Sequence, residues 1–212
     1  MKRYTMPPRR DEDGEFLTPA WSEDVSLDRY LEACPESAET RGTFFQHVRD
    51  LVADTFGEVP EDLFEGISQR RWIPFQTYSL RDFMRLAHNA ARLAYPELAL
   101  ADGLRRIGWK SYPSFAATMA GRVVLFALGD QLEDVVRGAP KAYALGLPGA
   151  SIEAREIGPR HWRFELRDVY SFVDSYHYGV LEGAILAFSR VPDIRLRRLD
   201  RMSDAEFDVR WT

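Results

Sequence analysis

Residues 70–95, RRWIPFQTYSLRDFMRLAHNAARLAY, contain the clearest periodic pattern in the chain and constrain its fold more than any other segment. Apolar residues recur there every three or four positions, which predicts a helix over residues 79–95 that is buried along one side. Ser79 and Asp82 have the spacing of a capping box at its first turn. Pro96 is expected to end the helix, because the residue before a proline avoids the α region. The buried side is formed by Phe83, Leu86, Ala87, Ala90, Leu93 and Ala94.

The size and composition of the chain fit one soluble globular domain. It has 212 residues, of which 45% are hydrophobic and 29% charged. The net charge of −5 argues against a nucleic-acid-binding protein, which would carry a basic excess. No apolar run approaches the ~20 residues that span a bilayer, and the N-terminus lacks the apolar segment of a signal peptide. We therefore expect a cytoplasmic protein without a membrane span.

Several kinds of site have no matching motif in this sequence. Cys34 is the only cysteine, which excludes an internal disulfide and a zinc site built from several cysteines. Because it precedes Pro35 and stands alone, we expect it to be a small buried hydrophobe and not a nucleophile. Neither of the common glycine-rich phosphate-binding patterns occurs.

The first 144 residues predict a tail followed by helices. Residues 1–20 are rich in charge and poor in large apolar groups, so they are expected to be disordered. Residues 21–212 are expected to form a single domain, of which residues 21–144 are the helical half. Apolar periodicity predicts helices over residues 26–34, 41–56, 79–95, 97–108, 113–128 and 131–144, with a short helical piece after Pro60.

Residues 145–212 are expected to form the sheet half of the domain. Residues 162–166 alternate between apolar and charged, as in a strand with one face in water. Similar patterns predict further strands over residues 151–157, 194–199 and 205–211, and a helix over 175–190. The predicted class is α+β, an N-terminal helical half followed by strand–strand–helix–strand–strand, with that helix covering a small antiparallel sheet. Gly179 and Gly183 would let the helix pack closely on the sheet.

A cluster of polar residues lies between the second strand and the last helix. Ser171, Asp174 and His177 are close in sequence, but a catalytic triad is defined by three-dimensional geometry that such near neighbours rarely attain. We expect a strand-to-helix turn here, in which serine and aspartate cap the helix. An enzyme using Asp174 and His177 in a cleft between the halves remains an alternative. No matching pair of metal ligands lies on another predicted helix, so no metal site is predicted.

Arginines gather on one face of the predicted sheet. Strand alternation places them opposite Glu206 and Asp208. The face is then either a solvated ladder of paired charges or a site for an anion or an acidic partner. The arginines concerned are Arg163, Arg167, Arg195 and Arg197.

A set of short motifs resembles a known family. In chain order they are Cys34-Pro35, Thr40-Arg41-Gly42-Thr43-Phe44-Phe45, Tyr78-Ser79, Asp82-Phe83, Ala90-Ala91-Arg92, Gly179-Val180-Leu181-Glu182-Gly183 and Val209-Arg210-Trp211. Together they are similar to a paralogous family of proteins of unknown function, found mainly in myxobacteria, over roughly residues 25–212. The order of helices and strands is more distantly similar to the haem–nitric oxide/oxygen (H-NOX) sensor superfamily. That superfamily in turn resembles the vinyl-reductase-like ligand-binding domains and the subunits of TRAPP vesicle tethers.

The H-NOX resemblance implies a pocket between helices and sheet, but this sequence departs from the haem site. Tyr143 takes the place of the haem-binding histidine on the helix before the sheet, and no histidine occurs between residues 89 and 160. The Tyr-x-Ser-x-Arg signature for the haem propionates is also missing, since residues 168–172 read DVYSF. No haem or other cofactor is therefore expected. The acylated cysteine of TRAPP subunits has no counterpart, because Cys34 lies ahead of the matching helices.

Three hypotheses of function remain. The first is a non-enzymatic, haem-free sensor or adaptor in signalling that binds a small apolar ligand or a protein partner. The second is a structural scaffold that forms a homodimer, and the third is the enzyme described above. A closed apolar cavity would favour the sensor or adaptor. Convergent polar groups with shifted pKa values would favour the enzyme. A filled interior beneath an exposed apolar patch would favour the scaffold. The residues expected to line the cavity are Trp72, Phe75, Tyr143 and Trp162.

Overall fold

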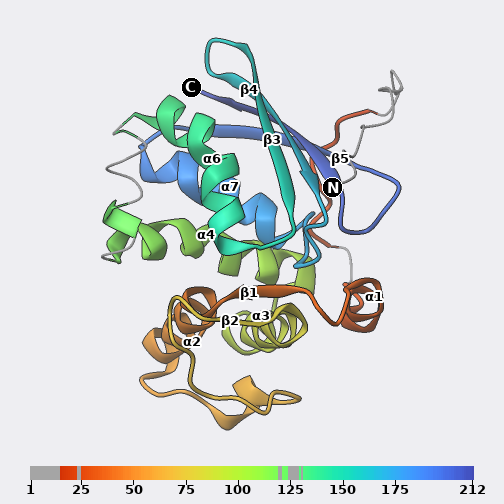
Figure 1. The fold of residues 1–212 in the computed structure, drawn as a ribbon, viewed down its shortest axis with the longest axis vertical. Coiled ribbons are helices and arrows are strands. Elements are labelled where there is room, and N and C mark those ends of the chain that lie inside the picture. The colour runs from red at the N-terminus through yellow and green to blue at the C-terminus, as the bar shows by residue number, and fades with distance from the viewer. Residues whose placement is uncertain (1–14, 23–24, 119–120, 124–128, 130) are drawn as a thin grey trace, which may run out of the picture.

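The computed structural model describes residues 15–22, 25–118, 121–123, 129 and 131–212 of the chain. Helices dominate the first part of the chain and strands the last part (Figure 1). In order, the elements are α1 (Leu27–Ala33), β1 (Glu39–Arg41), α2 (Gly42–Phe56), the 3₁₀ helix η1 (Glu61–Phe64), β2 (Thr77–Ser79), α3 (Leu80–Ala94), α4 (Leu100–Ala117), α6 (Leu132–Gly146), β3 (Ser151–Gly158), β4 (His161–Arg167), α7 (Tyr176–Ala187), β5 (Pro192–Arg198) and β6 (Ala205–Trp211).

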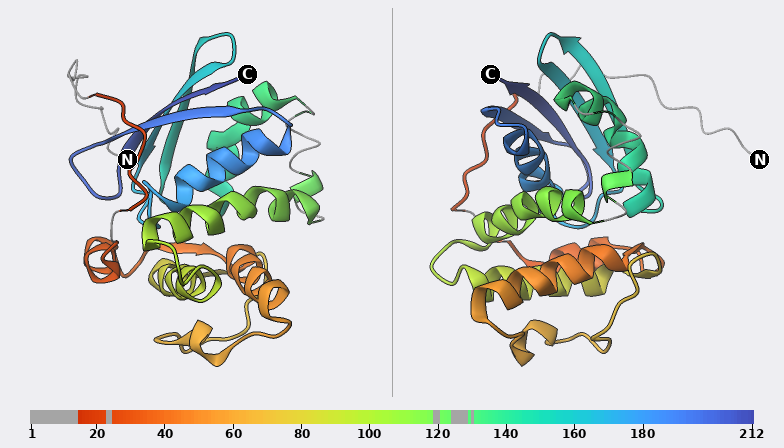
Figure 2. Two further views of the ribbon diagram at one scale, coloured as in Figure 1. Left: turned by 180° about the vertical axis from the view of Figure 1, so that it is seen from behind. Right: turned by 90° about the vertical axis from the view of Figure 1, so that its left-hand side faces the viewer.

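The elements are arranged in three layers along the long axis of the molecule (Figure 1). A lower layer contains α1, α2 and α3, a middle layer contains α4 with α7 above it, and the main sheet forms the top. Figure 2 shows α6 and α7 beneath the same curved sheet. This arrangement confirms the predicted α+β class. It also places α6, which sequence order assigns to the helical half, against β3 of the sheet.

The main sheet has the strand order β3-β4-β6-β5, and every neighbouring pair is antiparallel. Because side chains alternate between the two faces of a strand, the apolar residues of β4 and β6 share the inner face and the charged residues share the outer face. This confirms the predicted strands. The buried inner residues of these two strands are Trp162, Phe164, Leu166, Ala205, Phe207, Val209 and Trp211.

A second sheet, formed by β1 and β2, was not predicted. Each strand has three residues, and Thr40 pairs with Tyr78 at its centre. So short a strand shows no alternation that a sequence could reveal. The sheet links the layers, because the buried Thr40 hydroxyl donates a hydrogen bond of 3.1 Å to the carbonyl of Gly146 at the end of α6.

The predicted helix at residues 79–95 is confirmed as α3, but the predicted capping box is wrong. Ser79 makes no capping hydrogen bond through its side chain. The N–H of Leu80 donates instead to Ala38, across the small sheet, at 2.8 Å. Asp82 accepts a hydrogen bond from Arg85 at 3.0 Å. A backbone carbonyl next to the small sheet therefore accepts a hydrogen bond from the first amide of α3, that of Leu80.

The separate helices predicted for residues 97–108 and 113–128 are wrong in their boundary, because α4 continues through Pro113 to Ala117. A proline inside a helix leaves the carbonyl four residues earlier without its partner. That carbonyl belongs to Trp109, and it lies against Gly183 of α7. Met119, Ala120 and Phe126, which we expected on the second helix, lie outside the described residues. Among the helices that are described, none is both long and apolar enough to cross a membrane.

The two helices α4 and α7 are in contact through their backbones at three glycines. A Cβ atom added to Gly108 would lie 1.9 Å from the carbonyl oxygen of Tyr176, and one added to Gly179 would lie 2.0 Å from that of Arg105. At Gly183 the corresponding distance to the Trp109 oxygen is 2.1 Å. The prediction that Gly179 and Gly183 face the sheet is therefore wrong, because both face α4.

The N-terminal segment reaches the outer edge of the sheet. Leu17 exchanges two backbone hydrogen bonds with Leu196 of β5, at 2.9 and 2.8 Å. The tail predicted over residues 1–20 thus has its last residues placed against β5, while residues 1–14 lie outside the described part.

Substitution of Gly179 by alanine tests the helix contact. Alanine normally stabilises a helix by up to about 1 kcal/mol relative to glycine. Here we expect a loss of about 2 kcal/mol in the free energy of unfolding, because the new methyl group would press on a backbone carbonyl that cannot rotate away. Urea denaturation measures the change. The control is Gly158→Ala, where no atom lies within 4 Å of the added Cβ and the effect should stay within about 0.5 kcal/mol. An unchanged or higher stability of Gly179→Ala would contradict the prediction.

Candidate ligand-binding site

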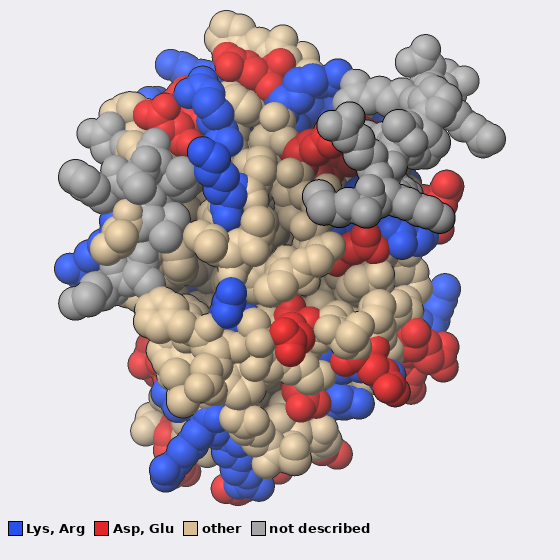
Figure 3. Space-filling model, viewed as in Figure 1, with Lys and Arg blue, Asp and Glu red and all other residues tan. Residues whose placement is uncertain are grey.

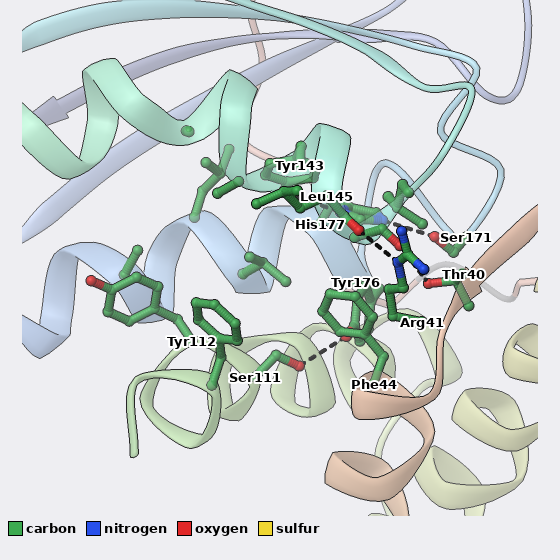
Figure 4. A pocket seen from close by; sticks show the side chains of 18 of the residues that line it. Thr40, Arg41, Phe44, Ser111, Tyr112, Tyr143, Leu145, Ser171, Tyr176 and His177 are labelled. Atoms are coloured by element: carbon green, nitrogen blue, oxygen red, sulfur yellow. Dashed lines mark hydrogen bonds between the residues drawn. The ribbon is translucent and has the colours of Figure 1, made fainter. Parts of the chain in front are cut away.

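A cavity of about 430 Å³ lies where the helices of the lower and middle layers and α6 meet the inner face of the sheet. Its volume falls within the range of roughly 300–1,000 Å³ that is usual for small-molecule sites. Most of its wall is apolar and comes from α2, α4, α6, α7 and the sheet (Figure 4). The apolar lining includes Phe44, Phe83, Phe115, Val135, Val136, Ala139, Phe164, Val180, Leu181, Ala184, Ile185 and Val209.

The cavity extends along α7. This helix contributes lining residues from His177, at its start, to Ile185, near its end. At 1.5 Å per residue these positions are about 12 Å apart. Tyr112 of α4 lies toward the distal end, where its ring packs 6.4 Å from that of Phe188. In Figure 4 Tyr112 is well separated from the polar residues around His177.

Three polar side chains form a hydrogen-bonded chain at the proximal end of the cavity. His177 Nδ1 lies 3.1 Å from the Tyr143 hydroxyl, and its Nε2 lies 2.9 Å from the Ser171 hydroxyl. A neutral imidazole has one donor and one acceptor nitrogen. One tautomer of His177 can therefore satisfy both contacts. The turn before α7 makes this possible, since Phe172 adopts a φ of 57° and brings Ser171 back toward the helix.

The three side chains of this hydrogen-bonded chain are uncharged at neutral pH. Burial lowers the pKa of His177 to about 3, because the charged imidazolium would lose its hydration. Burial likewise raises the pKa of Tyr176 to about 12 and raises the pKa of Tyr143 above its ordinary value. The Tyr176 hydroxyl is hydrogen-bonded to Ser111 at 2.9 Å.

Arg41 lies at the opening of the cavity. Its Nε donates to the carbonyl of Leu145 at 3.0 Å, and its Nη1 donates to the carbonyl of Phe75 at 2.8 Å. The side chains of Phe75 and Leu145 are 71% and 59% exposed, which shows that this end of the cavity reaches the surface. Figure 3 shows a largely uncharged area between α6 and the lower layer on this side of the molecule.

The structure brings two of the four predicted pocket residues to the cavity. Phe75 and Tyr143 line it, whereas Trp72 and Trp162 do not. Trp72 is buried in the lower layer, where it stacks on Phe45 with ring centroids 4.8 Å apart. Trp162 is buried on the inner face of the sheet, under the guanidinium of Arg137 at 5.5 Å.

The residues of the enzyme hypothesis are divided between two places. Ser171 and His177 are in contact, but Asp174 points away from them. Asp174 accepts hydrogen bonds from the Tyr30 hydroxyl at 2.8 Å and from Arg198 Nε at 3.0 Å, beside a second cavity of about 310 Å³. No group of three metal-ligating side chains occurs among the residues that the structure describes.

The four predicted arginines do share the outer face of the sheet, and each is paired with a carboxylate. Arg163 lies 3.2 Å from Asp208, and Arg195 lies 3.5 Å from Asp193. The other pairs are Arg167 with Glu165 and Asp204, and Arg197 with Glu206. Phe16 lies over two of them, 4.7 Å from Arg163 and 4.9 Å from Arg197. These contacts agree with a ladder of paired charges, and a role in binding an anion or an acidic partner stays a prediction.

Sequence reasoning missed several residues of the site, among them Arg41, Ser111 and Tyr176. Arg41 is part of a motif that carried the family resemblance, but no pattern marked it as a lining residue. Ser111 and Tyr176 lie on separate helices, and only the contact of α4 with α7 brings their hydroxyls together. Cys34 is 3% exposed, as expected for a small buried hydrophobe.

The residues of the cavity do not fit a haem group. His177 is the one histidine among the described lining residues, and both of its ring nitrogens face hydroxyl groups within hydrogen-bond distance. A tyrosine ligates haem iron as tyrosinate, but the Tyr143 hydroxyl already lies in a hydrogen bond of 3.1 Å with His177 Nδ1. The cavity therefore offers no prepared iron ligand.

The buried histidine predicts a dependence of stability on pH. An unfolded histidine has a pKa near 6.5, and the folded value for His177 is lower, at about 3. Its contribution to stability is therefore fully present above the unfolded value and is lost as the pH falls. Between pH 7 and pH 5 we expect His177 to remove about 2 kcal/mol from the free energy of unfolding.

Urea unfolding at the two pH values measures this loss. His177→Gln keeps polar groups near both hydroxyls but cannot titrate, so the drop should shrink by about 2 kcal/mol. Ser171→Ala is the control, because it removes a neighbour and leaves the titrating group in place. The prediction fails if His177→Gln shows the same pH dependence as the parent protein.

Solved structures of H-NOX proteins share this fold. The H-NOX protein from S. oneidensis in the Fe(II)NO state is 12% identical, with a TM-score of 0.61 over 81% of this chain and 99% of that one. The Fe(II) unliganded protein from K. algicida is 16% identical, with a TM-score of 0.59 over 81% and 96%. A mutant H-NOX from T. tengcongensis is 13% identical, with a TM-score of 0.61 over 81% and 97%. At these identities the likeness establishes the fold alone.

The family comparison covers nearly the whole described chain. No curated protein matches the sequence. The sequence model described as "Protein of unknown function (DUF2378)" matches residues 35–212, which include every helix and strand from β1 onward. This range also contains all the residues that line the cavity. The chain therefore belongs to the DUF2378 family, and its fold is that of the H-NOX domains.

Proposed function

We propose that this protein is a haem-free sensor or adaptor domain that binds a small apolar ligand in the cavity along α7 and signals through a protein partner. The observation that carries the proposal is the cavity itself. Protein interiors are close-packed and contain few voids larger than a water molecule. A space of about 430 Å³ with an apolar wall and an opening beside Phe75 and Leu145 has the properties of a ligand site.

The fold neighbours support this interpretation. Their descriptions refer to Fe(II), Fe(II)NO and unliganded states, so those proteins hold an iron centre that takes a ligand. We propose that the present chain keeps a pocket in the same architecture and uses it for a ligand without iron. The neutral Tyr143, His177 and Ser171 would then contact the ligand where a haem would need a coordinating group.

A bound ligand would contact all three layers of the molecule and could therefore affect how they are arranged. Phe44 belongs to the lower layer, Phe115 to the middle layer and Phe164 to the sheet, and all three line the cavity. A ligand in contact with all of them stabilises one arrangement of the layers, by an amount set by its preference for that arrangement. A partner that contacts two layers would detect this difference.

Filling the cavity with a side chain tests the proposal. Ala184→Trp places an indole in the apolar wall, so the affinity for N-phenyl-1-naphthylamine, an uncharged fluorescent probe, should fall by at least about tenfold. Ala187→Trp is the matched control, because Ala187 is exposed on the same helix and does not line the cavity. Probe fluorescence gives both affinities. Equal binding by parent and Ala184→Trp would contradict the proposal.

Native mass spectrometry of protein purified from its own host distinguishes the sensor from the scaffold. A retained small mass in the parent that is missing from Ala184→Trp supports the sensor. An intact dimer that retains no small mass and binds no probe supports the homodimeric scaffold instead.

The enzyme hypothesis named Asp174 and His177, which the structure separates, and the observation that favours an enzyme is instead the contact of 2.9 Å between Ser171 and His177. No carboxylate supports the imidazole, since its other nitrogen faces Tyr143. Ser171 is also 1% exposed. We therefore expect no labelling of Ser171 by a fluorophosphonate under conditions that label a serine hydrolase completely. Labelling that Ser171→Ala abolishes would assign a hydrolase activity.

A further inference from the structure

We infer that the ligand of this cavity is a single-chain amphiphile with a carboxylate head, whose anionic group is bound by Arg41 at the opening and whose alkyl chain lies along α7. The inference rests on the proposed function and adds the chemical class and orientation of the ligand. It follows from the position of one charged side chain at the opening of the cavity and from the uncharged character of the other lining side chains.

Arg41 alone carries a charge among the described residues that line the cavity. The remaining polar groups of the wall are hydroxyls and an imidazole that burial keeps neutral. A cation beside an apolar space favours an anion, because a charge with reduced hydration is stabilised by a partner of opposite sign. The wall provides no such partner from its own side chains.

Two hydrogen bonds hold the guanidinium of Arg41 in place, and they use only some of its N–H donors. A guanidinium has five N–H donors, and Arg41 uses donors on Nε and Nη1 for the carbonyls of Leu145 and Phe75. Among the described residues, its side chain contacts these two carbonyls and forms no ion pair with a carboxylate. The other described arginines without a carboxylate partner are exposed, whereas Arg41 is half-buried. Hydrogen bonds to two backbone carbonyls thus fix the guanidinium group of Arg41, and its remaining N–H donors can bind a carboxylate.

The position of Arg41 fixes the direction of the ligand. It lies beside Phe75 and Leu145, whose exposure marks the opening of the cavity. The apolar wall then continues along α7 for about 12 Å toward Tyr112. A charged head at the opening stays near water, while the alkyl chain is removed from water along the apolar wall, which is favourable. The opposite orientation would place the charge on the apolar wall, about 12 Å along α7 from the polar end beside Arg41.

Competition experiments with matched ligands test the inference. Decanoate, decan-1-ol and decan-1-amine have the same chain and differ in the charge of the head. Each is used to displace N-phenyl-1-naphthylamine from the parent protein. We expect decanoate to bind about tenfold more tightly than the alcohol, as a charge-assisted hydrogen bond implies, and the amine to bind most weakly.

Variants of Arg41 assign the preference to this residue. Arg41→Gln should weaken decanoate about tenfold and change the alcohol by less than about twofold. Arg41→Lys keeps the charge and should retain part of the preference. The control is Arg137→Gln, which changes an arginine of α6 that does not line the cavity and should alter neither affinity.

The possible results separate the inference from the proposed function. Equal binding of the three ligands by the parent protein overturns the inference and leaves the proposed function standing. The same holds if Arg41→Gln weakens decanoate and the alcohol in equal proportion, since Arg41 would then only tie α6 to the lower layer. If neither the probe nor any decyl compound binds the parent, the proposed function fails, and the inference fails with it.

Discussion

The backbone contact between α4 and α7 is the constraint on which the rest of the structure depends. Gly108, Gly179 and Gly183 allow the two helices to approach until carbonyl oxygens of one helix touch the α-carbons of the other. This contact fixes the rotation of α7 about its axis. Once the glycines face α4, the side chains of His177, Leu181 and Ala184 face the space beneath the sheet. The pair Arg105–Glu182, at 2.6 Å, holds the same register from the side. The rotation of α7 and its close contact with α4 therefore determine where the cavity lies.

The chemistry of the cavity differs from what its fold would suggest. H-NOX structures with Fe(II) centres have the same architecture at 12–16% identity, yet here the interior is a neutral chain of two hydroxyls and an imidazole. Burial keeps this chain uncharged, because every ionised form would lose hydration without gaining a partner. A fold specifies where an enclosed space lies, and individual side chains specify what can occupy it.

The helices with strong periodicity and the four strands of the main sheet could be predicted from the sequence, because their patterns follow from burial on one side. The three-residue strands β1 and β2 could not, since they are too short for a pattern. Pro113 indicated a helix boundary, but α4 continues past it, and the Trp109 carbonyl that loses its helical partner lies against Gly183, a residue distant in sequence. For the site, Phe75 and Trp72 were indistinguishable, because both lie in an irregular segment before β2. Arg41 was missed because its environment comes from α6 and from the loop before β2, which the sequence alone does not bring together.

The pairing of Leu17 with Leu196 has a consequence for how this protein could assemble. An open sheet has two edge strands, and unpaired backbone groups on an edge invite another chain to add a strand. In this sheet the edges are β3 and β5, and the N-terminal segment already occupies hydrogen-bonding groups of β5. An added strand would have to displace that segment at β5, whereas no other described segment forms backbone hydrogen bonds with the outer edge of β3. If a second molecule were to extend this sheet, it would meet less competition at β3, which lies against α6.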